Sequence, residues 1–473
     1  MPGPPSPALL DDLESLLGPA GFTRDEQAMA PWLRDWRGRY RGRAAAMLSP
    51  DSTGQVQAIV AACASEGAAL VPQGGNTSMV GGATPGDEGG LLLSLRRMNS
   101  VRSVSAQDNV ATAEAGVILS DLHATAAAAG RRFPLSLGAK GSATVGGLVS
   151  TNAGGTQVLR FGPMRSLVLG LEAVLPDGSL FEGLSPLRKD NRGYDLKQLL
   201  IGAEGTLGVV TAASLRLVAA AGSSAVAWVG VDSPEAALAL LRRLEASLGD
   251  SVESFELVPR DALGLVLAGI PGTRAPLAGS PAWNVLVESI APQGGRDASE
   301  ALQEALAAAL GDGLVEDAAI ASSEAQAAAL WRLRESIAEA ERLHGPSVKH
   351  DVSVPVSAMP AFLGEARAAV EARFAGARVV AFGHLGDGNV HFNVQPPAGE
   401  AAEGWLDAHG EAVTRAVHDL VVATGGSISA EHGIGRMKRA EYARTAPPAR
   451  LAAQRSIKAA LDPAGIMNPG KLL

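Results

Sequence analysis

Apolar residues recur along the chain at two spacings, which predict a mixture of helices and strands. After residue 52 the spacing of one helical face is followed by a short apolar strand at residues 69–71. Further strands, separated by glycine-rich loops, continue to residue 218, so we predict an α+β domain in this part of the chain. The helical face is formed by Val56, Ile59, Val60 and Cys63.

At residues 379–394, two apolar runs flank a Gly-Asp-Gly-Asn turn, and apolar and polar residues alternate in the second run, residues 390–394. Such a turn between apolar runs predicts a β-hairpin. In the second strand the apolar side chains point to one face, and His391 and Asn393 point to the other. His384 ends the first strand. Because neutral imidazole is the commonest metal ligand, the hairpin is a candidate metal site, with a solvated surface turn as the alternative.

The pattern changes after the small, Gly/Ser-rich residues 219–224. Beyond them, strands and longer helices predict an antiparallel sheet with helices on one face. A chain of 473 residues is too long for one hydrophobic core, so we expect several domains. The predicted division is an N-terminal segment (1–42), a first domain (43–220), a second domain with the hairpin (221–424) and a C-terminal segment (425–473).

Charge and cysteine content narrow the function classes. Forty Lys and Arg against 49 Asp and Glu give a net charge of −9, which argues against nucleic acid as the main partner. The single cysteine forms no internal disulfide and no thiolate metal cluster, which suits a reducing cytoplasm. The N-terminus lacks the basic and apolar regions of a signal peptide, and no apolar run is long enough to predict a transmembrane span.

Three glycine clusters, at residues 72–82, 138–155 and 202–210, need a common explanation. Glycine allows a backbone to approach a ligand closely and to direct successive N–H groups at it. No Gly-x-Gly-x-x-Gly fingerprint follows a strand, and no Gly-Lys-Ser/Thr follows a cluster, so nicotinamide and Walker-type sites are disfavoured. The clusters favour a phosphate-bearing cofactor of open identity over a set of simple turns.

These segments also resemble a known family. Residues 72–82, 133–147, 151–156, 189–196 and 202–210 look like the flavin-binding domain of the vanillyl-alcohol oxidase type. Residues 382–394 and 429–435 resemble the D-2-hydroxyacid dehydrogenases of that superfamily, which include D-2-hydroxyglutarate, D-lactate and glycolate dehydrogenases. The resemblance implies a two-part FAD-binding domain, an antiparallel-sheet cap domain for the substrate and a C-terminal helical segment.

The resemblance implies FAD as the cofactor. Some relatives attach the flavin through a histidine in the first loop, and Asn76 stands at that place here, so we expect non-covalent FAD. The residues expected to contact it are Pro72, Gly74, Gly75, Asn76, Thr77, Ser78, Gly81, Pro134, Gly138, Gly141, Ser142, Thr144, Gly147, Asn152, Gly154, Gly155, Glu204, Gly205, Gly208 and Val209.

By the same resemblance, His384, His391 and Glu431 are expected to bind zinc, although ferrous iron or manganese would fit the same ligands. The metal would act as a Lewis acid on the substrate hydroxyl. His432 follows directly and is the expected catalytic base, because its ordinary pKa is near neutral. A fourth ligand or a solvated loop histidine is the alternative for His432.

The resemblance also implies that Arg334, Lys349, Asn393 and His432 bind the substrate. The alternative for Arg334 is a solvated helix residue paired with a neighbouring glutamate. One position departs from the hydroxyglutarate type: Ala338 stands where that type carries a substrate-contacting threonine. The missing hydroxyl leaves the side chain of the substrate open.

The expected reaction is oxidation of a D-2-hydroxy acid to the 2-oxo acid, with hydride transfer to FAD. An electron-transfer flavoprotein or a quinone is the acceptor that the resemblance implies, and a homodimer is compatible with it. The alternatives are an oxidase that uses oxygen, a flavoprotein subunit of a glycolate-oxidase-like complex and a non-redox metal hydrolase.

Overall fold

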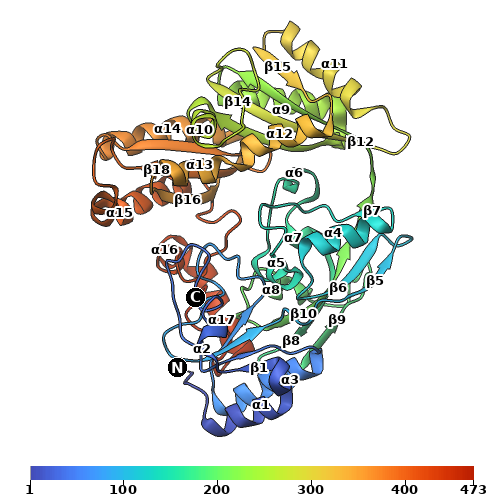
Figure 1. The fold of residues 1–473 in the computed structure, drawn as a ribbon, viewed down its shortest axis with the longest axis vertical. Helices are drawn as coiled ribbons and strands as arrows, with labels where there is room; N and C mark the ends of the chain where they lie inside the picture. The colour runs from blue at the N-terminus through green and yellow to red at the C-terminus, as the bar shows by residue number, and fades with distance from the viewer. Residues whose placement is uncertain (1) are drawn as a thin grey trace. The chain divides into compact units, whose positions relative to one another are not determined.

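The computed structural model describes residues 2–473, which divide into two compact units (Figure 1). Unit 1 contains residues 2–154, 162–219 and 431–473. Unit 2 contains residues 155–161 and 220–430. The chain therefore passes between the units four times. The end of the second glycine-rich region, at Gly155, belongs to unit 2.

Unit 1 begins with a four-stranded sheet in the order β1-β2-β4-β3. β2 (Ala46–Leu48), β4 (Leu91–Ser94) and β3 (Leu70–Gln73) are parallel, and β1 (Phe22–Thr23) pairs antiparallel with β2. α1 (Pro7–Gly21) and α3 (Thr53–Glu66) cover this sheet. The buried face of α3 is the one that the helical spacing predicted, including the fully buried Cys63. Burial raises the pKa of the Cys63 thiol to about 12, which makes it a core residue.

A second, antiparallel sheet of unit 1 has the order β5-β6-β10-β8-β9. Its strands are β5 (Val101–Ser105), β6 (Val110–Glu114), β10 (Val209–Arg216), β8 (Val168–Val174) and β9 (Leu180–Gly183). The predicted C-terminal helical segment consists of α16 (Arg439–Thr445) and α17 (Pro448–Leu461). Beyond α17, Met467 forms a β-bridge with Leu70, which ties the C-terminus to β3.

Unit 2 is organised around one antiparallel sheet of seven strands, β15-β12-β14-β13-β17-β18-β16 (Figure 1). The strands are β15 (Asp317–Ile320), β12 (Ala221–Val231), β14 (Trp283–Pro292), β13 (Val252–Pro259), β17 (Arg378–His384), β18 (Asn389–Gln395) and β16 (Val348–Ser353). β17 and β18 form the predicted hairpin, in which Phe382 pairs with His391. The predicted alternation is confirmed, because Val390, Phe392 and Val394 are buried in the core.

Helices cover both faces of this sheet, so the prediction of helices on one face is wrong. One face packs against α9 (Pro234–Leu248), α11 (Ala298–Gly311), α14 (Met359–Arg373) and α15 (Ala402–Ala423). The other packs against α10 (Arg260–Gly269), α12 (Glu324–Glu335) and α13 (Ile337–His344). The reason lies in the central strands: all eight residues of β13 are buried, so side chains on both faces need an apolar cover.

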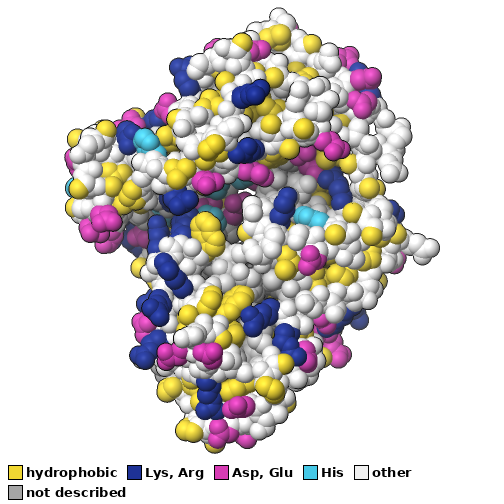
Figure 2. Space-filling model, in the orientation of Figure 1, with side chains coloured by type: hydrophobic (Ala, Val, Ile, Leu, Met, Phe, Trp, Pro, Cys, Tyr) yellow, Lys and Arg dark blue, Asp and Glu magenta, His cyan; other side chains and the backbone are white. Residues whose placement is uncertain are grey.

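On the face drawn in Figure 2, Lys and Arg side chains are interspersed with Asp and Glu. Among residues 2–473, no helix combines the length and the apolar composition that crossing a bilayer requires.

Candidate functional site

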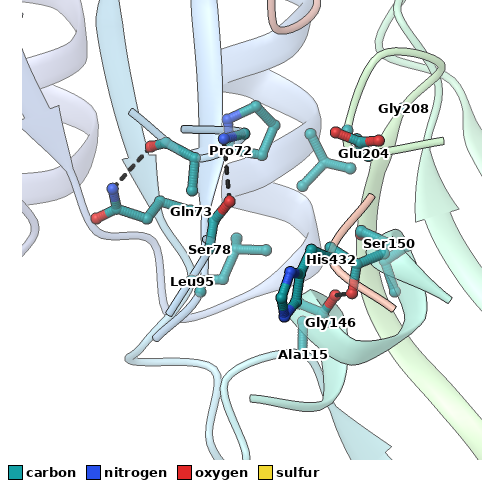
Figure 3. A pocket seen from close by; sticks show the side chains of 18 residues that line it. Pro72, Gln73, Ser78, Leu95, Ala115, Gly146, Ser150, Glu204, Gly208 and His432 are labelled. Carbon is teal, nitrogen blue, oxygen red and sulfur yellow. Dashed lines mark hydrogen bonds between the residues drawn. The ribbon is translucent and has the colours of Figure 1, made fainter. Parts of the chain in front are cut away.

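A cavity in unit 1 lies where the glycine clusters meet (Figure 3). It holds about 620 Å³, counting space open to solvent. The end of β3 forms one wall of the cavity, and α5 (Val145–Thr151) and the start of β10 form further walls. Its lining residues are Pro72, Gln73, Gly74, Ser78, Gly82, Ala83, Leu95, Ala115, Gly146, Gly147, Ser150, Thr151, Glu204, Gly205, Gly208, Val209, Val210 and His432.

The first glycine loop packs tightly against the second cluster. A Cβ on Gly74 would lie 2.2 Å from the Thr144 hydroxyl oxygen, so only glycine fits there. That oxygen is buried and has no hydrogen-bond partner in the described structure. Asn76 adopts a φ of 53°, and its side-chain Nδ2 donates to the Arg34 backbone carbonyl oxygen at 2.9 Å. The loop is therefore fixed by its own contacts, and one buried hydroxyl beside it remains unsatisfied in the described structure.

Glu204 fixes the segment that follows His432. Its two carboxylate oxygens accept the backbone N–H groups of Ile434 at 2.8 Å and Gly435 at 2.7 Å. Burial raises the pKa of Glu204, opposed by these N–H groups and by Lys438 and Lys471. Both oxygens are occupied by the backbone, so Glu204 holds the loop in place at the wall of the cavity.

Eight of the residues predicted to contact the cofactor line this cavity: Pro72, Gly74, Ser78, Gly147, Glu204, Gly205, Gly208 and Val209. The lining also includes residues that the sequence reasoning missed, among them Gln73, Gly82, Gly146 and Ser150. These belong to the same glycine-rich runs, and the missing information was which side of each loop faces inwards. His432 is part of the lining, together with Ser150 and Gly146, and all three are labelled in Figure 3.

In unit 2, the hairpin contributes a polar cluster to the sheet face that carries α10, α12 and α13. His384 and His391 lie with ring centroids 5.6 Å apart, and the ring of His391 lies 5.0 Å from that of Phe382. Asn393 pairs across the strands with Lys349, which brings two predicted substrate residues to neighbouring positions. The strand register thus collects the polar residues of three strands on one face.

A buried carboxylate of β13, Glu256, joins two of the predicted site residues. Its Oε1 lies 2.7 Å from His384 Nδ1, and its Oε2 accepts from Nε and Nη2 of Arg334, each at 2.9 Å. The guanidinium also stacks over Phe382, 5.0 Å from the ring centroid. Burial favours the neutral acid, but His384 and Arg334 outweigh it and lower the pKa of Glu256. Arg334 is therefore neither solvated nor paired with a helix neighbour.

A second buried carboxylate, Glu341 of α13, faces the other predicted cation. Its Oε2 accepts from Asn393 Nδ2 at 2.7 Å and lies 3.4 Å from Lys349 Nζ. Its Oε1 is buried without a hydrogen-bond partner in the described structure. Burial raises the pKa of Glu341, against the opposing effects of Lys349 and Asn393.

Glu431 and His432 follow directly on the last residue of unit 2. The N–H of Ala430 donates to the Asp351 carbonyl oxygen on β16 at 3.3 Å, and Ser427 bridges to Ser353 of the same strand. One peptide bond beyond Ala430 the chain enters unit 1 at Glu431, and His432 then lines the cavity of that unit.

Two family models match the chain. Residues 44–183 match the FAD binding domain, and residues 221–472 match the C-terminal domain of FAD linked oxidases. A mitochondrial D-2-hydroxyglutarate dehydrogenase of Bos taurus is 40% identical over 467 residues, covering 98% of this chain and 83% of the relative. A D-2-hydroxyglutarate dehydrogenase of Xanthomonas citri is 40% identical over 440 residues, covering 93% of this chain and 91% of the relative.

The chain belongs to the FAD-linked D-2-hydroxyacid dehydrogenase family. The dehydrogenase also shares its fold with p-cresol methylhydroxylase, at a TM-score of 0.76 and 15% identity, covering 98% of this chain and 96% of that one. Alkyldihydroxyacetonephosphate synthase gives a TM-score of 0.73 at 15% identity, covering 99% of this chain and 87% of that one. The predicted α+β fold of the vanillyl-alcohol oxidase type is confirmed.

The cavity of the dehydrogenase fits FAD. Glycine-lined walls admit a close approach to a pyrophosphate. Next to the lining residue Gly74, the buried Thr144 hydroxyl has no hydrogen-bond partner in the described structure. The sequence reasoning missed two residues of unit 2, Glu256 and Glu341. Glu256 had a signal, because the carboxylates of Glu253 and Glu256 in the otherwise largely apolar strand at residues 252–259 predict buried, paired charges.

Proposed function

We propose that this dehydrogenase oxidises a D-2-hydroxy acid to the 2-oxo acid, with His432 as the catalytic base. The observation that carries the proposal is that His432 belongs to the lining of the cavity that fits FAD. A base in that wall can take the hydroxyl proton of a substrate whose C2–H points at the flavin. Bound FAD supplies the acceptor for the hydride.

We further propose a divalent metal held by His384, His391 and Glu431, with zinc as the first choice and iron or manganese compatible with the same donors. The Glu256–His384 bond supports this proposal. A metal-binding histidine usually donates its second ring N–H to a carboxylate, which fixes the tautomer and the ring orientation. The ion would supply Lewis acidity to the substrate hydroxyl.

The chain's own polar groups give the substrate its orientation. Asn393 and Lys349 border His391 on the same face of the sheet, and Arg334 reaches that face from α12. We propose that they surround the carboxylate and side chain of the substrate, and that FAD is non-covalent because Asn76 stands in the first loop. The acceptor is proposed to be an electron-transfer flavoprotein or a quinone, the compartment the cytoplasm, and the assembly a homodimer.

The variant His432→Gln tests the base. General-base catalysis contributes about 10²–10⁴-fold, so we expect anaerobic flavin bleaching by a D-2-hydroxy acid to slow by at least about 100-fold. FAD and metal content, measured by absorbance and elemental analysis, should be unchanged. His344→Gln, at an exposed histidine of unit 2, is the matched control and should bleach at the wild-type rate. A His432→Gln enzyme with wild-type bleaching would contradict the proposed role.

A further inference from the structure

The two cations that are expected to bind the substrate, Arg334 and Lys349, each have a buried carboxylate as partner. Arg334, only 8% exposed, places Nε and Nη2 on Glu256 Oε2. Lys349 lies beside Glu341, whose side chain is fully buried. Two positive and two negative charges therefore cancel in the part of unit 2 where the substrate side chain is proposed to lie.

We propose that the substrate is a 2-hydroxy monocarboxylic acid, and that Glu341 is the residue that determines this specificity. The inference rests on the proposed function and deepens it. A second carboxylate beside Lys349 has to compete with a carboxylate that is already built into the protein. Arg334 is already partly committed, because its Nε and Nη2 bond to Glu256 and its flat face is stacked on Phe382.

The geometry around Glu341 makes the exclusion specific. Oε2 is held by Asn393 at 2.7 Å, so the carboxylate cannot swing away without breaking that bond. Oε1 is buried and unsatisfied, so it is an acceptor that repels an incoming carboxylate and offers it no hydrogen. Ala338, one turn before Glu341 on α13, adds no hydroxyl that would compensate.

The test compares holoenzyme reduction by D-lactate and D-2-hydroxybutyrate with reduction by D-malate and D-2-hydroxyglutarate, as anaerobic flavin bleaching. We expect kcat/KM to favour the monocarboxylates by at least about tenfold. Glu341→Gln keeps the acceptor for Asn393 and removes the charge, so it should move the ratio at least about tenfold towards the dicarboxylates. Glu341→Leu, which also removes the charge, should move it the same way if the glutamine variant does not fold.

Glu339→Gln is the matched control, because Glu339 is an exposed carboxylate of the same helix that pairs with Arg342. It should leave the ratio unchanged. Binding of pyruvate and of 2-oxoglutarate to the oxidised holoenzyme, followed by calorimetry, gives a second readout without turnover and should show the same preference. A wild-type preference for dicarboxylates, or an unchanged ratio in both Glu341 variants, overturns the inference. If no D-2-hydroxy acid bleaches the flavin, the proposed function is wrong and the inference falls with it.

Discussion

Replacing Glu256 by Gln should destabilise unit 2 strongly, because it leaves a buried guanidinium without its counter-charge. Glu256 is fully buried and Arg334 is 8% exposed, so water screens the pair very little. Breaking a buried ion pair by removing one partner costs about 3–5 kcal/mol. For a unit of about 220 residues, in which 1 kcal/mol shifts the Tm by about 2–4 °C, the expected loss is about 10 °C.

Tryptophan fluorescence is a suitable probe of this transition. Four of the six tryptophans belong to unit 2, including the buried Trp228, so the signal reports mainly on that unit. The double variant Glu256→Gln/Arg334→Met removes both charges and should recover at least half of the lost Tm, because neutral replacements of a buried pair are tolerated far better than one orphaned charge. Glu335→Gln, at an exposed carboxylate on α12, is the control.

The same variant should weaken binding of the proposed metal, since the bond from Glu256 to His384 Nδ1 orients the imidazole. Loss of such a supporting carboxylate lowers metal affinity by about 10–100-fold, which competition with a chelating dye can measure. A Glu256→Gln protein that melts within 2 °C of wild type would refute the electrostatic reasoning, and wild-type metal affinity would refute the orienting role. The two outcomes are independent because one depends on Arg334 and the other on His384.

Two further predictions concern unit 1. Acid precipitation should release the flavin into the supernatant, and yellow colour that stays with the pellet would show a covalent link despite Asn76. Burial, reinforced by Arg436, lowers the pKa of Lys471 to about 8, so the charged Lys471 destabilises the folded protein below that pH. The unfolded lysine holds its proton up to about pH 10.5, so wild-type stability rises with pH between about 8 and 10.5. Lys471→Met lacks this rise. The Tm of the variant should therefore exceed the wild-type Tm most below pH 8, and this excess should shrink between about pH 8 and 10.5. A Tm difference that does not change with pH would contradict the lowered pKa of Lys471.

Local patterns predicted the hairpin well, because burial of one face imposes a period of two. The alternation of Phe392 and Asn393 needs no knowledge of what packs on either side. The second helical layer escaped prediction for the opposite reason: whether α12 lies on the face shared with α9 or on the other one depends on contacts between distant segments. The sequence contained the apolar strand β13, whose burial on both sides requires that layer.

Partners of charged side chains were the least predictable feature. The helix neighbours of Arg334 include glutamates within reach, yet its guanidinium bonds to Glu256, 78 residues earlier in the chain. Nothing in the spacing of α12 indicates a partner on β13. The cofactor loops show the same limit: the glycine clusters located the cavity, but only the fold decides that Ser150 faces inwards and that Glu204 turns to the backbone of Ile434.

Glu256 and Glu341, two of the buried carboxylates of unit 2, have different physical roles. This difference explains why Glu256 should control stability and Glu341 specificity. Both oxygens of Glu256 are bonded, and its pKa is lowered, so it is a fixed anion on which His384 and Arg334 are oriented. Glu341 keeps one oxygen unsatisfied and has a raised pKa, so the fold gains less from its charge. A buried group that destabilises the fold is the better candidate for a residue selected for function. We therefore expect that substitutions at position 341 can change the substrate preference without loss of the sheet that carries the site.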